Sequence, residues 1–138
     1  MNILIQNYYI ISFWNCSFTD EDSKHILGHW IELFNSSAVL ITNSVFYNIH
    51  TPIIIGRSCS YLKFYFVHIA NCIVLKQQHT ISNHVYIINT KHVIISKCNF
   101  LRNKGRSSGV IEIQHAASFN ICDTIFYSNF VQNKGGIL

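Results

Sequence analysis

The side chains able to do acid–base chemistry are few and scattered. Only six carboxylates occur in 138 residues, and three of them form the run Asp20, Glu21 and Asp22. Carboxylates in such a run can contribute oxygen ligands to a Ca²⁺ site, or they can begin a short helix through Ser23 or Ile26. We favour a third interpretation, a solvated turn.

Glu32 and Glu112 hold equivalent positions in a repeat described below, but they belong to its first and fourth copies. Three strand spacings separate such positions by about 14 Å. A pair of carboxylates that cleaves a glycosidic bond must lie closer together than this. We therefore expect both side chains to face solvent.

The eight histidines do not form a metal-binding pattern. His25 and His29 are four residues apart, as two ligands on a helix would be, but Gly28 intervenes. Further histidines fall in different registers of the repeat, namely His68, His84, His92 and His115.

The five cysteines are an odd number without close spacing, which argues against a disulfide framework and against a zinc site. Cys16, Cys72 and Cys98 fall in a column of small residues predicted to face inward, where a free cysteine behaves as a small hydrophobe. Cys122 is predicted to point outward and Cys59 to lie in a turn. We assign no catalytic, cofactor-binding or metal-binding residue from the sequence.

The net charge of +4 arises from few charged side chains, and Lys and Arg are scattered along the chain apart from one concentration of cations. This concentration consists of Lys97, Arg102, Lys104 and Arg106. We interpret it as a solvated turn rather than as a patch for nucleic acid or an anionic glycan. No segment resembles an aromatic–basic stacking platform, so nucleic acid is not an expected partner.

The chain repeats itself. Five segments align on a polar residue that follows an apolar-x-apolar pair and precedes a small residue. The polar residues are Asn15, Asn43, Asn71, Lys97 and Asp123, with spacings of 28, 28, 26 and 26 residues. A fixed period of this length is typical of a solenoid, whose repeats bury their apolar faces only against one another.

Other columns of the alignment are apolar or small in every copy. Four residues before the polar position stand Ile11, Val39, Val67, Val93 and Phe119. Two before it stand Phe13, Ile41, Ile69, Ile95 and Ile121. One after it come Cys16, Ser44, Cys72, Cys98 and Thr124, and three after it come Phe18, Phe46, Val74, Phe100 and Phe126.

The spacing of two within each unit is strand periodicity, and the β-branched and aromatic residues agree with it. A second strand follows about half a repeat later, over His29–Phe34, Ile53–Ile55, His84–Ile88, Val110–Ile113 and Ile137–Leu138. The bends beside these strands are predicted at Gly28, Gly56, Gly109 and Gly135–Gly136.

Strands that recur once per repeat in the same chain direction must pair in parallel, and such crossovers are nearly always right-handed. The sequence therefore predicts an all-β fold, a right-handed parallel β-helix solenoid of about five coils with a repeat of 26–28 residues. Leucine-rich repeats have a similar period but need Leu at most apolar sites. An antiparallel sandwich would not explain a polar column in every copy.

Residues 1–138 are predicted to be a single β-helix domain. The first residues, 1–19, carry no charged side chain, yet Ile11 and Phe13 fall in core columns, so we interpret this segment as the first coil and not as a signal peptide. No segment is apolar enough to span a bilayer. Both ends lack a polar cap, which predicts a fragment of a longer solenoid that aggregates alone.

Outward-facing aromatics are the one positive sign of a binding surface. Tyr47 and Tyr127 share an outward column with Leu75 and Leu101, and Trp14 points outward one residue before its polar position. Such side chains suit contact with a sugar or with a protein, but we favour the interpretation that a loop or tail of the parent protein covers this face.

The columns resemble those of the pectate-lyase-like right-handed β-helix superfamily. The C-terminal third is similar to the repeats of polymorphic outer-membrane proteins, a group of surface adhesins and autotransporters. Their Phe-x-x-Asn pattern is matched by Phe100–Asn103, Phe126–Asn129 and Phe130–Asn133, and their Gly-Gly-Ala-aliphatic pattern by residues 135–138 and, in degenerate form, 108–111. The first three repeats depart from both patterns. Asparagines at tight bends would form a ladder of hydrogen bonds from coil to coil.

The resemblance implies an extracellular or cell-surface location and a non-enzymatic scaffold or adhesive role. The expected partners are a glycan or a host or cell-surface protein on the outer sheet face, together with flanking coils of the parent chain. The alternative is a fragment of a carbohydrate-active lyase or hydrolase whose catalytic residues lie outside this chain. An intracellular or virus-type β-helix with a structural role is a further alternative. No cofactor is expected.

Overall fold

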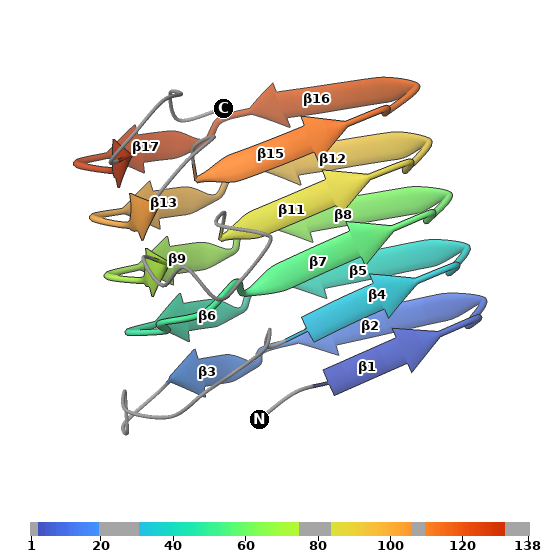
Figure 1. The fold of residues 1–138 in the computed structure, drawn as a ribbon, viewed down its shortest axis with the longest axis horizontal. Helices are drawn as coiled ribbons and strands as arrows, with labels where there is room; N and C mark the ends of the chain where they lie inside the picture. The colour runs from blue at the N-terminus through green and yellow to red at the C-terminus, as the bar shows by residue number, and fades with distance from the viewer. Residues whose placement is uncertain (1–2, 20–30, 75–83, 106–109, 132–138) are drawn as a thin grey trace.

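The computed structural model describes residues 3–19, 31–74, 84–105 and 110–131, and these form a right-handed parallel β-helix. The chain winds upward through stacked coils, each of which adds one strand to each of three sheets (Figure 1). All pairings within the sheets are parallel, as the repeat predicts, so the antiparallel alternative is wrong. The described coils contain three or four strands each, where a leucine-rich repeat has one strand and a helix or turn, so that alternative is wrong as well.

The first sheet contains β1 (Ile3–Gln6), β4 (Ile31–Phe34), β7 (Ile54–Arg57), β11 (Val85–Ile88) and β15 (Ile111–Gln114). The second sheet contains β2 (Ile10–Trp14), β5 (Ala38–Thr42), β8 (Tyr61–Tyr65), β12 (His92–Ser96) and β16 (Ser118–Cys122). The third sheet contains β3 (Ser17–Thr19), β6 (Val45–Tyr47), β9 (His68–Ala70), β13 (Asn99–Leu101) and β17 (Ile125–Tyr127).

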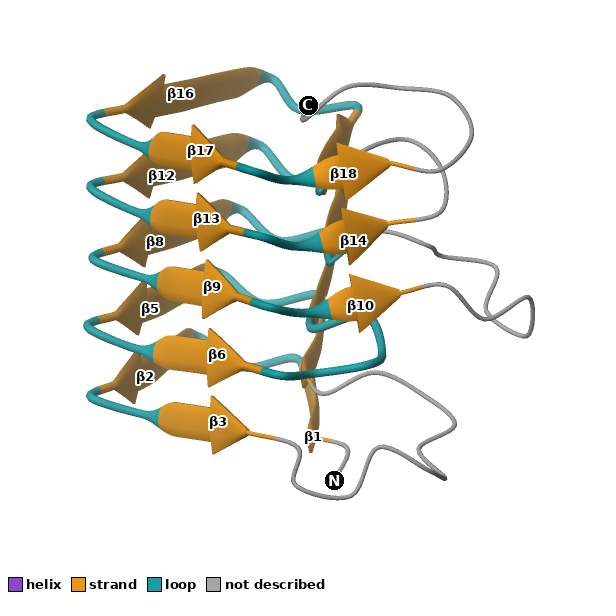
Figure 2. Ribbon diagram, turned by 90° about the vertical axis from the view of Figure 1, so that its left-hand side faces the viewer, coloured by secondary structure: helices purple, strands orange, loops and turns teal. Residues whose placement is uncertain are grey.

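A short fourth sheet continues from the third in the later coils (Figure 2). It contains β10 (Ile73–Val74), β14 (Lys104–Gly105) and β18 (Phe130–Val131). The sequence predicts two strands per coil, and the structure has three or four, because the polar position of each repeat is a corner between two strands.

The second predicted strand of each coil lies in the first sheet, with shifted bounds. The predicted Ile53–Ile55, His84–Ile88 and Val110–Ile113 correspond to β7, β11 and β15. β1 pairs with β4 and was not predicted as a separate strand. Ile137–Leu138 and Gly28, Gly109 and Gly135–Gly136 lie outside the described residues.

The predicted register is wrong in the third coil. Asn71 does not align with Asn15 and Asn43, because Val39 pairs with Leu62 and Leu62 pairs with Val93. The residue at the corner of the third coil is therefore Phe66. The core columns contain Leu62, Phe64 and Ile69 in place of the predicted Val67, Ile69 and Val74. Because the corner residue is Phe66 and not Asn71, the repeat before this corner is shorter than predicted and the repeat after it is longer.

Each corner is made by a residue with left-handed backbone. The described part of the chain contains fourteen non-glycine residues with positive φ, and all of them fall in three columns. The corner from the first to the second sheet has Asn7, Asn35, Ser58, Asn89 and His115; the next corner has Asn15, Asn43, Phe66, Lys97 and Asp123; the last has Asn48, Asn71, Arg102 and Ser128. Asparagine tolerates this conformation better than most residues, which explains its frequency at the corners.

A small polar residue commonly follows the left-handed one and closes the turn. Ser44 Oγ donates to Thr42 O at 2.9 Å, Thr124 Oγ1 to Cys122 O at 2.9 Å and Cys98 Sγ to Ser96 O at 3.2 Å. The preceding coil also bonds such a side chain, since Cys16 N donates to Ser44 Oγ at 3.2 Å. These side chains satisfy backbone groups where the strands bend.

The core is built from identical columns stacked along the axis. Phe18 stacks on Phe46 with ring centroids 4.7 Å apart, and Phe100 stacks on Phe126 at 4.9 Å. Ile69 separates the two pairs in the same column. The spacing is that of neighbouring strands, so aromatic stacking and strand pairing are satisfied together.

Gly56 lies inside β7 and not at a bend, contrary to the prediction. Its column otherwise contains large apolar residues, namely Ile5, Leu33, Ile87 and Ile113. A Cβ at Gly56 would lie 3.2 Å from Leu62 Cδ2, so the neighbouring sheet fills the space that a side chain would take.

Within the described ranges no helix is long and apolar enough to cross a membrane.

Candidate functional site

A cluster of aromatic and basic side chains lies on the outer face of the second sheet, at its corner with the third. Lys63 and Tyr65 point outward from β8, Phe66 is the left-handed residue that follows it, and Lys97 occupies the same corner one coil later. We call these four residues the Tyr65 cluster. The sequence did not predict it, because the residues are 34 positions apart at most and the third coil was misaligned.

Both lysines of the Tyr65 cluster interact with the same ring. Lys63 Nζ lies 4.9 Å from the Tyr65 ring centroid and Lys97 Nζ lies 5.5 Å from it. Lys97 Nζ also donates to the Tyr65 hydroxyl at 3.4 Å and lies 5.3 Å from the Phe66 ring. The Tyr65 and Phe66 rings meet edge to face at 4.5 Å. Each of these contacts is a weak electrostatic attraction at an exposed site.

Phe66 is the unusual member of the cluster. Its φ is 51°, and it is the one apolar side chain among the described residues with left-handed backbone. Nearly half of its surface is exposed, at 48%. A bulky residue in this conformation is strained, and strain of this kind costs about 1–3 kcal/mol.

Trp14 shares an outward column with Tyr65. The column runs Trp14, Thr42, Tyr65, Ser96 and Cys122. Trp14 is 67% exposed, so the prediction that it points outward is confirmed. Thr42 separates Trp14 from Tyr65, which places the two aromatics two strand spacings apart.

Tyr47 and Tyr127 point outward from the third sheet and are exposed, as predicted. Leu101 shares their column, as predicted, but the corrected register puts Ala70 there in place of Leu75. The second and third sheets meet at a corner, so their exposed aromatic side chains lie on two adjoining outer faces.

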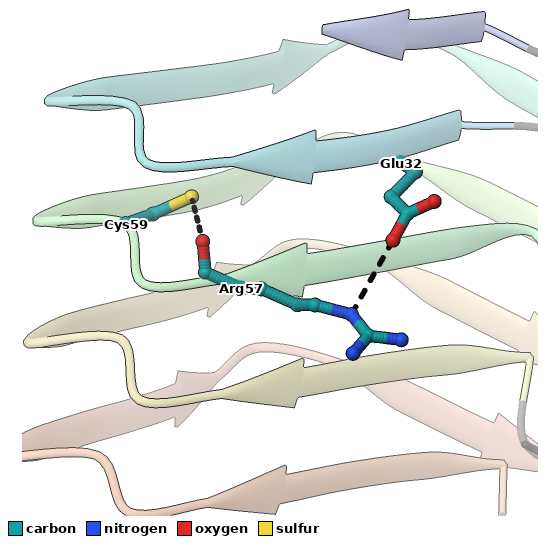
Figure 3. Close-up of polar contacts among 3 residues, drawn as sticks. All are labelled: Glu32, Arg57 and Cys59. Carbon is teal, nitrogen blue, oxygen red and sulfur yellow. Dashed lines mark hydrogen bonds and ion pairs between the residues drawn. The ribbon is translucent and has the colours of Figure 1, made fainter. Parts of the chain in front are cut away.

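Glu32 and Glu112 occupy one outward column of the first sheet with Ile55 and Tyr86 between them, so the predicted separation of three strand spacings is confirmed. Figure 3 shows that Glu32 faces Arg57, whose Nε lies 3.4 Å from Glu32 Oε1. Glu112 accepts a hydrogen bond from Gln114 Nε2. The two carboxylates therefore have separate partners, and their spacing does not suit paired acid–base catalysis.

The histidines are also dispersed. His84 is fully buried, with Nε2 3.0 Å from Cys72 O and Nδ1 without a hydrogen-bond partner. Burial lowers the pKa of His84 to about 4, against the opposing effect of the Cys72 carbonyl. Within the described residues no three His, Cys, Asp or Glu side chains gather into a possible metal site.

His92 Nδ1 lies 2.8 Å from Ser118 Oγ on the exposed face of the second sheet. A serine beside a histidine is the beginning of a nucleophilic dyad, which also needs a group that orients the imidazole and donors for an oxyanion. No carboxylate among the described residues is paired with His92. The contact is therefore a cross-strand hydrogen bond of the sheet.

The cysteines are free and structural. Cys72 and Cys98 are buried as predicted, Cys59 is buried in its turn, and Cys16 and Cys122 are half-buried. The corrected register moves Cys72 into the column of Ile49, Asn103 and Asn129. Burial raises the pKa of the Cys72 thiol to about 12, so the thiol does not ionise at neutral pH.

The predicted concentration of cations is divided by the fold. Lys97 and Arg102 lie at two different corners and Lys104 lies in β14, while Arg106 is outside the described residues. Asp20, Glu21 and Asp22, the predicted acidic turn, and His25 and His29 also lie outside them.

The asparagine ladder expected from the Phe-x-x-Asn pattern is present. Cys72 N donates to Asn103 Oδ1 at 3.0 Å, and Asn103 Nδ2 donates to Ile69 O at 2.9 Å and to Asn129 Oδ1 at 3.1 Å. The left-handed residues, however, are the preceding Arg102 and Ser128. The two asparagines point into the coil instead of making the corner themselves.

No known family model, curated protein or solved structure matches the chain.

Proposed function

We propose that this β-helix is a non-enzymatic scaffold or adhesive segment of a larger extracellular or cell-surface protein. The observation that carries the proposal is the exposure of aromatic side chains on the outer faces of the second and third sheets, at Trp14, Phe66, Tyr47 and Tyr127. Exposed aromatics on a rigid support suit the recognition of a glycan or a protein surface.

The arrangement of the carboxylates supports a binding role over a catalytic one. Glu32 and Glu112 are three strand spacings apart and Asp123 lies at a corner of another column. A hydrolytic site needs two carboxylates, or a base and an electrophile, around one substrate bond. The described residues hold aromatic side chains on a rigid surface, but they contain no such pair.

The asparagine ladder supports the proposed relationship to pectate-lyase-like β-helices and to the repeats of surface adhesins. Asn103 and Asn129 occupy the Asn position of the Phe-x-x-Asn pattern, and each follows a Phe of the stacked pair Phe100 and Phe126. In this proposal the ladder maintains the coil geometry and the outer faces carry the contacts.

Adhesion of coated beads tests the proposal. Fluorescent beads carrying the folded protein should adhere to cells that display surface glycans and proteins, more strongly than beads carrying the triple variant Trp14→Thr, Tyr47→Thr and Tyr127→Thr. Threonine is the native residue in these columns, at Thr42 and Thr19, so the variant should keep the fold. Equal adhesion by both proteins, or turnover of polygalacturonate by the folded protein, would overturn the proposal.

A further inference from the structure

The fold requires a left-handed backbone at the corner that Phe66 occupies, but it does not require a phenylalanine there. Its corner column contains Asn15, Asn43, Lys97 and Asp123, all with φ between 49° and 54°. Any of these polar residues makes the same corner, and asparagine makes it with less strain than phenylalanine. An aromatic residue at this corner therefore places an apolar ring in solvent at the expense of stability. Backbone strain of this kind commonly marks a functional position.

Two side chains of the Tyr65 cluster contact the ring of Phe66. Tyr65 meets it edge to face at 4.5 Å and Lys97 Nζ lies 5.3 Å from its centroid. The neighbouring corner residues along the axis are Asn43 and Lys97, neither of which covers it with an apolar side chain. With 48% of its surface exposed, Phe66 is held in place yet open to a partner.

The two lysines give the site its charge preference. Both ammonium groups lie within 5.5 Å of the Tyr65 ring centroid, so both add positive charge beside the same ring. Neither is paired with a carboxylate of the described residues. An anionic group placed beside Tyr65 would be attracted by both lysines.

The chemistry of the Tyr65 cluster favours an acidic peptide over a nucleic acid or a glycan. Nucleic-acid binding depends on many phosphate contacts, and the Tyr65 cluster offers two cations. A sugar needs hydrogen-bonding groups around its stacking ring, whereas Phe66 has none and the Tyr65 hydroxyl is engaged by Lys97. An apolar side chain flanked by carboxylates matches an apolar ring flanked by ammonium groups.

We propose that the Tyr65 cluster binds an acidic peptide segment of a partner protein, with an apolar side chain against Phe66 and carboxylates at Lys63 and Lys97. This inference rests on the proposed adhesive function and names the partner class for one part of the surface. The aromatic ring acts as the central anchor and the two lysines form the charged rim.

Fluorescence anisotropy with a labelled peptide, acetyl-Glu-Glu-Leu-Glu-Glu-amide, tests the proposal. We expect saturable binding that weakens as salt is added, and no binding of the matched peptide with lysine in place of glutamate. Phe66→Asn should weaken binding by about tenfold or more, and Lys63→Gln with Lys97→Asn should do the same. Lys91→Gln is the matched control, since Lys91 is an exposed lysine of another corner, and it should bind as the native protein does.

Thermal unfolding separates a binding effect from a folding defect. Phe66→Asn relieves backbone strain, so its midpoint should rise or stay unchanged while binding is lost. Undiminished peptide binding by this variant would overturn the proposal, as would tighter binding of polygalacturonate or of single-stranded DNA at the same residues. If the beads still adhere to cells but the peptide does not bind, this inference fails and the proposed function stands. If the beads do not adhere at all, the proposed function fails.

Discussion

Asn103 and Asn129 stack one coil apart, and the amide of one donates to the amide of the other at 3.1 Å. Asn103 is fully buried, and its side chain also bonds Cys72 N and Ile69 O. The Asn103 side chain thus satisfies two backbone groups of the preceding coil and donates a hydrogen bond to the side chain of Asn129 in the following coil. The position is apolar in the second coil, at Ile49, which shows that the corner itself does not need an amide.

Asn103→Ala should therefore destabilise the protein more than the small loss of side-chain volume suggests. The substitution leaves Cys72 N without an acceptor and Ile69 O without its side-chain donor, and each buried unpaired group costs about 1–3 kcal/mol. Urea unfolding should show the lowered midpoint. Asn120→Ala is the control, because Asn120 is exposed on β16, and its free energy of unfolding should change by no more than about 0.5 kcal/mol. Equal midpoints for the two variants would contradict the structural role of the ladder.

His84 should make the protein sensitive to acid. The pKa of His84 is about 4 in the folded protein, because burial disfavours the charged imidazole, and 6.5 in the unfolded chain. The stability associated with neutral His84 is then fully present above pH 6.5, and it is lost as the pH falls from 6.5 towards 4. The loss amounts to about 3 kcal/mol at the low end of this window.

Urea unfolding at several pH values between 7 and 4 measures this effect. His84→Gln keeps a donor for the Cys72 carbonyl and removes the titrating group, so its stability should fall less steeply over the window. Parallel pH profiles for the variant and the native protein would show that His84 does not titrate as described.

The thiols should differ in reactivity according to their place in the coil. Burial raises the pKa of Cys72 to about 12 and also raises those of Cys59 and Cys98. Cys16 and Cys122 are half-buried, so reagent reaches them more readily. Under native conditions a disulfide reagent at pH 8 should label Cys16 and Cys122 first, and the other three only on the timescale of unfolding. Rapid labelling of Cys72, detected by mass spectrometry, would contradict its position in the core.

The fold was predictable from the sequence because most columns repeat without interruption. The register of the third coil was not predictable, because the residue at its corner is atypical. A polar corner after an apolar-x-apolar pair identifies Asn15, Asn43, Lys97 and Asp123, all of which have left-handed backbone. Phe66 breaks this pattern, and Asn71 imitates it five residues later at a different corner. A local pattern cannot separate two corners of similar sequence, whereas strand pairing with both neighbouring coils does.

The candidate site escaped prediction for the same reason. Lys63, Tyr65 and Phe66 fell at positions that the wrong register did not place on an outer face, and Lys97 was counted with sequence neighbours that the fold separates from it. A sign of the site was present in the sequence, since residues 61–66 alternate in the manner of a strand, with Lys63 and Tyr65 on one side and Leu62 and Phe64 on the other.

Gly56→Ile should destabilise the protein even though it restores the consensus of its column. Every other member of this inward column is Ile or Leu, so alignment alone predicts a gain in stability. The space is occupied by Leu62, whose Cδ2 would lie 3.2 Å from a Cβ at this position, and Leu62 is itself fully buried. Overpacking of this kind costs about 1–3 kcal/mol.

The double variant Gly56→Ile with Leu62→Ala shows whether these two residues share one volume. Leu62→Ala alone should cost about 2–5 kcal/mol because it leaves a cavity. If the isoleucine fills that cavity, the double variant should be more stable than the sum of the two single changes predicts, by at least about 1 kcal/mol in urea unfolding. Additive losses would mean that Leu62 is not what excludes a side chain at Gly56, and the third coil would then need another reason for its glycine.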